Sequence, residues 1–155
     1  MKRRLPLIGL LLVPLMAGAV LASPAGSDGP MPGVSNAGQA QLDYMLKCRG
    51  CHRPDGSGDD VSNPPMNGKV AKFLHVPGGR EFLGRVPGVA TVDLDNDRLS
   101  NVLNWTLYRF DRGNLPAGFK PYTPVEVGRL RQSPLRTERA AARAALVARM
   151  PGGVL

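Results

Sequence analysis

The chain has 155 residues, two cysteines and a formal net charge of +8, from 20 lysines and arginines against 12 aspartates and glutamates. Its basic residues are not interleaved with aromatic ones in the manner of single-strand nucleic-acid binders, so the composition gives no support to nucleic-acid binding. The positive charge instead indicates docking to an acidic partner protein or, at most peripherally, to a membrane surface.

The first 22 residues have the three parts of a secretory signal peptide. Lys2, Arg3 and Arg4 form a positive start, the apolar run Leu5–Val20 follows, and Ala22 ends a small-residue cleavage site. The run is about 16 residues, shorter than the ~20 that a spanning helix needs, so we expect cleavage rather than a retained anchor. Cleavage leaves 155 − 22 = 133 residues, enough for one small domain, and the charge falls to 8 − 3 = +5.

The sequence around Cys48, Cys51 and His52 predicts covalent haem attachment. Two cysteines three positions apart, with a histidine directly after the second, are typical of c-type haem sites. Each thiol would form a thioether with one vinyl group of the porphyrin, and the histidine would then bind the iron from below as its proximal ligand. Since bacteria attach this haem outside the cytoplasmic membrane, the motif and the signal peptide agree with a periplasmic location.

Other roles for a CxxC pair are less well supported. A four-ligand zinc site needs two more cysteines or histidines nearby, and the only further candidate is His75. A thioredoxin-like site needs a strand before the motif, whereas the preceding residues predict a helix. A disulfide or a redox dithiol remains the alternative to haem attachment.

The region before the motif predicts a lead and one helix. Residues 23–35 are rich in Pro, Gly, Ser and Ala, which predicts a flexible lead. An asparagine at position 36 then provides an N-cap for a helix over Ala37–Lys47, which runs directly into the motif. Leu42, Met45 and Leu46 lie at helical spacing, and Tyr44 adds an aromatic residue next to them.

The region after the motif predicts one short and one long helix. Proline- and glycine-rich loops lead to a short apolar helical segment over Val70–Leu74, and Val76–Val92 is expected to be irregular because two Pro-Gly pairs interrupt it. The clearest helix has Asn96 or Asp97 as its N-cap and ends at Asp111-Arg112-Gly113. Its apolar face comprises Leu99, Val102, Leu103, Thr106, Leu107 and Phe110.

Residues 116–155 predict a helical C-terminal extension. Thr123 to Glu126 have the pattern of a capping box with proline at the first helical position, which predicts a short helix to about Gln132. A last helix is expected over about Leu135–Met150. Because it is rich in alanine and arginine, we expect a solvated, loosely packed helix; the alternative is a basic surface for a partner or for anionic lipid.

From about Ala37 to Phe110 the order of features resembles a class I cytochrome c. The matching features are Gly38 and Tyr44 in the first helix, Cys48-Arg49-Gly50-Cys51-His52, the loop glycines Gly56 and Gly58, the loop Pro64-Pro65-Met66-Asn67-Gly68, and the later helix bearing Trp105. The resemblance implies an all-α, cytochrome c-like domain at residues 36–115 around one covalent haem c, with crossing terminal helices and a partly exposed haem edge.

One departure from the family concerns the distal iron ligand. The family usually supplies a methionine from the loop before its last helix, but Val76–Val92 contains no Met, His or Lys. The donors left after the motif are Met66, His75 and Met150. Met66 falls where the family has an apolar residue against the haem, and Met150 is distant in sequence. The distal position is therefore Met66, His75 or open.

These observations predict a periplasmic monohaem c-type cytochrome that carries single electrons. Cys48 and Cys51 would be the haem thioethers and His52 the proximal iron ligand. The partners would be redox proteins, a dehydrogenase or an oxidase, and no acid–base constellation favours catalysis by the protein itself. The alternatives are a haem enzyme or small-ligand-binding protein with an open iron site, and a haem subunit that docks to a larger dehydrogenase through residues 111–155.

Overall fold

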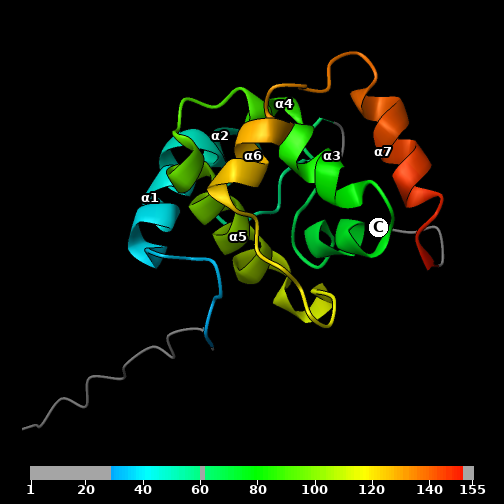
Figure 1. Cartoon of the computed structure of the whole chain (residues 1–155). Helices are drawn as coiled ribbons and strands as arrows, with labels where there is room; N and C mark the ends of the chain where they lie inside the picture. The colour runs from blue at the N-terminus through cyan, green and yellow to red at the C-terminus, as the bar shows by residue number, and fades with distance from the viewer. Residues whose placement is uncertain (1–28, 60–61, 152–155) are drawn as a thin grey trace, which may run out of the picture.

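The computed structural model describes residues 29–59 and 62–151, and within these ranges it contains helices and no β-strand (Figure 1). The all-α class is therefore confirmed. The expected signal peptide, residues 1–22, lies outside the described residues, as does the first part of the expected lead. No helix within the described ranges is both long enough and apolar enough to cross a membrane.

Two crossing helices, α1 (Ala37–Lys47) and α5 (Asn96–Asp111), form the centre of the fold. Each begins at a side-chain cap, Asn36 for α1 as predicted and Asp95 for α5, one residue before the predicted position. Most residues of α5 are buried because other helices surround it. This central helix is the element against which the haem motif and the C-terminal extension are both fixed.

The buried face of α1 includes only part of its apolar residues at helical spacing. Leu42 and Leu46 are 50% and 65% exposed, whereas Asp43 and Tyr44 are buried. The carboxylate of Asp43 is drawn inward by an ion pair with Arg98 of α5, so the helix presents the Asp43 side to its neighbour. Of the residues predicted at helical spacing, Met45 packs against the core beside the buried Tyr44, whereas the two leucines are exposed, because the pattern of apolar residues does not reveal a buried ion pair.

A short helix lies where one was predicted, at Val70–Leu74, but Val76–Val92, which was predicted to be irregular, also contains helices. The 3-10 helix η1 (Val70–His75) is followed by α3 (Gly79–Arg85) and α4 (Pro87–Ala90). Gly79 serves close packing, because a Cβ at this position would collide with the carbonyl oxygen of Phe73. The Pro-Gly pair at 87–88 begins a helix rather than a loop, since proline suits the first helical turn.

The chain after α5 begins with η2 (Arg112–Asn114) and continues to α6 (Pro124–Leu130), which packs against α5 and α3. The predicted cap is present: the Thr123 hydroxyl accepts a hydrogen bond from the Glu126 amide at 3.2 Å. The Glu126 carboxylate does not return to the cap, because it forms a bidentate ion pair with Arg80 of α3 at 2.6 and 2.7 Å. This pair joins the extension to the body of the fold.

The last helix, α7 (Arg139–Val147), is shorter than predicted; as expected, most of it is solvent-exposed, and Leu146 is its one buried residue. Leu135 lies outside the helix because its amide donates to the Arg85 carbonyl at 2.8 Å, which fixes the backbone in a different direction. Leu135, Leu146 and Met150 are all buried in the common core. Figure 1 shows α7 lying along α3 at the edge of the molecule.

We expect Arg98→Leu to lower the free energy of unfolding, because the fully buried Asp43 carboxylate would lose its cation. This loss is smaller than that for a fully buried pair because the Arg98 side chain is 43% exposed. Chemical denaturation measures the change. Arg109→Leu, an exposed change on the same helix, is the control, and equal losses in both variants would contradict the importance of the pair.

Candidate functional site

The end of α1 presents the motif as one compact turn. The Cys48 amide donates to the Tyr44 carbonyl at 2.9 Å, and the single-turn helix α2 (Arg49–His52) follows directly. The amides of Cys51 and His52 both donate to the Cys48 carbonyl, at 3.2 and 3.0 Å. The two thiols and the imidazole therefore come from one short segment that is anchored to the central pair of helices.

The state of the two thiols does not favour redox dithiol chemistry. Both are free, Cys48 partly buried and Cys51 exposed. Burial raises the pKa of Cys48 to about 11, and the nearby carboxylate of Asp43 adds to the effect. A redox-active dithiol needs an easily formed thiolate, so a raised pKa argues against that role. A Cys48 thiol that remains protonated suits addition to a vinyl group, in which the sulfur and the hydrogen of the S–H group add across the double bond.

His52 has the burial and the protonation state that suit a metal-binding imidazole. Its Nδ1 atom is buried and has no hydrogen-bond partner among the described residues. Burial lowers the pKa of His52, against a weaker opposing effect of Asp59, so the imidazole is neutral at neutral pH. A neutral imidazole is the form that binds iron. The free thiols and this histidine together are a donor set that fits covalent haem.

The turn that leaves His52 is strained. Arg53 has φ 61° and ψ 164°, and no other non-glycine residue in the described ranges has a positive φ. Such a conformation costs about 1–3 kcal/mol for a residue with a side chain. The Arg53 amide donates to the Arg49 carbonyl at 2.7 Å, and its carbonyl accepts the Tyr44 hydroxyl at 2.6 Å. No sequence pattern indicates this hydrogen bond between Tyr44 and Arg53, so it was not predicted.

The loop after the motif folds back on His52. The Gly58 amide donates to the His52 carbonyl at 3.0 Å, and the Met66 amide donates to the Gly56 carbonyl at 2.9 Å. Both glycines have left-handed backbones, with φ 75° at Gly56 and 56° at Gly58. A Cβ on Gly58 would collide with the Asn63 carbonyl oxygen. The spacing of the glycines, noted in the family pattern, therefore has a steric cause here.

We expect Gly58→Ala to destabilise the loop beside His52 more than Gly68→Ala does. Both glycines are left-handed, with φ 56° and 63°, so each alanine carries a conformational cost of about 1–2 kcal/mol. Only Gly58 has a neighbour that the new methyl group would strike, whereas nothing lies within 4 Å of a Cβ on Gly68. Unfolding free energies of the two variants test this, and equal losses would contradict the steric argument.

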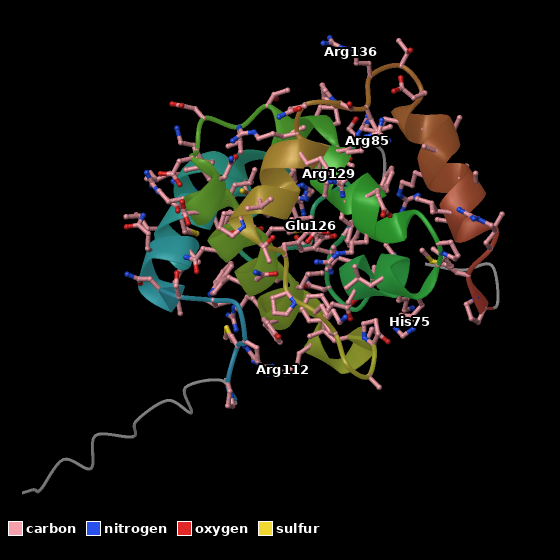
Figure 2. The ribbon with its side chains drawn as sticks, viewed as in Figure 1. His75, Arg85, Arg112, Glu126, Arg129 and Arg136 are labelled. Carbon is pink, nitrogen blue, oxygen red and sulfur yellow. The ribbon has the colours of Figure 1, made fainter. Side chains whose placement is uncertain are left out.

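The predicted distal donors lie in three different environments. Met66 is buried, and its backbone belongs to the loop that folds against the carbonyl of His52. His75 is exposed at the end of η1, with Nε2 at 2.8 Å from the Asn114 carbonyl oxygen; in Figure 2 it projects from the edge of the molecule, away from α1 in this view. Met150 is buried in the core after α7. The structure does not bring these three side chains together.

Comparison with known proteins points to one kind of protein. No protein-family model matches the chain. A cytochrome c-552 of Thermus thermophilus is 31% identical over 111 residues, which cover 60% of this chain and 85% of the relative. A second cytochrome c-552, from a named strain of the same organism, has the same identity over 111 residues, which cover 75% of that relative.

Proposed function

The chain belongs to the c-type cytochromes, electron-transfer proteins with haem c as their cofactor, and we propose that it carries single electrons in the periplasm, from a dehydrogenase to an oxidase or another acceptor. The observation that carries the proposal is the compact turn with two free thiols and a neutral imidazole whose Nδ1 atom has no partner among the described residues. Two features support export: the apolar run Leu5–Val20 near the N-terminus, and the attachment of haem c outside the cytoplasmic membrane in bacteria.

In this proposal Cys48 and Cys51 hold the haem through thioethers and His52 is the proximal ligand. Bound haem c supplies a reversible one-electron couple at iron. The protein's own residues anchor and orient this group: α1, which crosses α5, holds the Cys48 amide through the Tyr44 carbonyl, and the loop amide of Gly58 donates to the His52 carbonyl.

The charge distribution supports an acidic partner and gives the C-terminal extension a role in docking. Residues 23–110 carry nine basic and nine acidic residues, whereas residues 111–155 carry eight and three, so the second range alone has a net charge of 8 − 3 = +5. Figure 2 shows Arg85 and Arg136 beside the connection between α6 and α7, with Arg129 on α6. We propose that this basic side meets an acidic surface of the partner.

Two small oxidants of opposite charge test the electron-carrier proposal. We expect the reduced protein to transfer its electron rapidly to hexacyanoferrate(III), a trianion, and more slowly to tris(phenanthroline)cobalt(III), a trication. Because the protein is basic, added salt should slow the first reaction and accelerate the second. Stopped-flow absorbance measures both rates. Failure of both oxidants to react would contradict an exposed haem edge, and identical salt dependence would contradict electrostatic steering.

A second candidate function, binding of a small ligand at an open iron site, is favoured by one observation. The guanidinium of Arg131 donates to the carbonyls of Ala90, Val92 and Leu94, and so fixes the chain segment before α5. That segment contains no thioether or imidazole. If the distal position is open, carbon monoxide should shift the visible spectrum of the ferrous protein; an unchanged spectrum would exclude this function.

A further inference from the structure

We propose that Tyr44 and Arg53 act together as a positioning pair for the proximal ligand. The hydrogen bond from the Tyr44 hydroxyl to the Arg53 carbonyl, which we name the Tyr44–Arg53 brace, spans the whole motif from α1 to the turn after His52. The inference rests on the proposed role of His52 and adds two residues to it. The brace would set the direction in which the His52 ring meets the haem.

The brace closes a small ring of backbone and side-chain contacts around the motif. On one side, the Tyr44 carbonyl accepts the Cys48 amide at 2.9 Å, and on the other, the Arg53 amide donates to the Arg49 carbonyl at 2.7 Å. The hydroxyl contact at 2.6 Å joins the two ends. A rotation of the His52 backbone would have to break at least one of these bonds, because Arg53 follows His52 directly.

The strained backbone at Arg53 explains why a brace is needed. A residue with a side chain rarely holds φ 61° unless surrounding contacts enforce it. If the contact were lost, the turn would relax toward a common conformation, and the preceding peptide, which carries the His52 carbonyl, would turn with it. The loop after the motif also contacts this turn, because the Gly58 amide donates to the His52 carbonyl at 3.0 Å and the Gly56 amide donates to the Arg53 carbonyl at 3.3 Å. The Tyr44 hydroxyl adds a contact from outside the loop, because its ring is packed against α5.

Tyr44 is well placed to resist such a relaxation. Its ring packs between Trp105 and Phe110 of α5, with centroid separations of 5.4 and 5.1 Å. Burial is the main cause that raises the pKa of Tyr44 to about 12, so its hydroxyl remains a donor over the whole physiological range. Because the Tyr44 ring is packed against α5, its hydroxyl holds the turn after His52 in a fixed position relative to this central helix.

The test compares Tyr44→Phe with Tyr108→Phe in the full-length, haem-loaded protein. Tyr108 is also buried but makes no hydrogen bond through its hydroxyl to the described residues, so its variant controls for the loss of a phenol oxygen from the core. We expect Tyr44→Phe to keep its covalent haem but to shift the paramagnetically displaced NMR resonances of the His52 ring and the haem methyl groups. Tyr108→Phe should leave them in place.

A second substitution separates positioning from simple stability. Glycine adopts the Arg53 backbone conformation without strain, so Arg53→Gly should retain the wild-type resonances and should reduce the shift that Tyr44→Phe causes. A Tyr44→Phe protein that unfolds at lower temperature but has unchanged resonances would overturn the brace and leave a structural role only. Absence of covalent haem from the wild-type chain would instead contradict the proposed function and the brace with it.

Discussion

A chain in which both motif cysteines are replaced, Cys48→Ala/Cys51→Ala, is expected to retain no covalently bound haem. The two thiols are the only cysteines in the chain, so no other sulfur can replace them. Without a thioether, haem is held only by coordination and burial and is removed by acidified organic solvent. Mass spectrometry of the exported, denatured protein should therefore show the mass of the polypeptide alone, whereas the unsubstituted protein should carry the added mass of one haem.

Arg49→Ala is the matched control for the cysteine variant, because Arg49 lies between the two cysteines and is exposed. This variant changes the motif without removing a thiol, and it should retain the full haem mass. If the double cysteine variant still carried covalent haem, the assignment of the attachment residues would be wrong. If Arg49→Ala lost it as well, the loss could not be assigned to the thiols.

Truncation of the chain after Leu115 is expected to abolish stable folding. The removed residues include six apolar side chains that are buried in the common core: Tyr122, Val127, Leu130, Leu135, Leu146 and Met150. Burying one large apolar side chain contributes about 1.5–3 kcal/mol, so these six together match or exceed the ~5–15 kcal/mol that stabilises a typical domain. Far-UV circular dichroism should show a large loss of helix, and limited proteolysis should degrade the product rapidly.

A truncation that removes only residues 151–155 controls for the loss of the C-terminus, since it retains all six buried side chains. This shorter truncation should unfold like the full-length protein. A chain ending at Leu115 that folded, bound haem and merely lost affinity for a partner would contradict this expectation. It would support a separable docking extension instead, as the division at residues 115 and 116 predicted.

The sequence was sufficient for the helices whose signals are local. Asn36, Thr123 and the apolar repeat of α5 each act within a few residues, and the structure has helices where these signals lie. It was insufficient where a distant partner decides the outcome. Asp43 faces inward because it forms an ion pair with Arg98, 55 residues away in the sequence. The periodicity of apolar residues does not indicate that ion pair. Pro-Gly pairs were equally ambiguous, because proline both breaks helices and begins them.

In the candidate site, too, features with a local sequence signal were predicted and features that depend on other contacts were not. Cys48, Cys51 and His52 were predicted as site residues from spacing alone, because the chemistry of covalent attachment fixes their order. The contact between Tyr44 and Arg53 was not predicted. No sequence pattern indicates a hydrogen bond from a hydroxyl to a carbonyl nine residues away, or an arginine with a left-handed backbone. The distal ligand stays a prediction: the segment where the family places a methionine has no such donor, and Met66, His75 and Met150 lie apart.

The central claim, that this chain carries one electron on a covalently bound haem, is tested most directly by a potentiometric titration of the purified full-length protein followed in the visible spectrum. We predict a single reversible transition with the slope of a one-electron couple, identical in the oxidative and reductive directions. A chain without haem absorbance, or with a two-electron transition of the kind that a dithiol–disulfide pair gives, would contradict the claim.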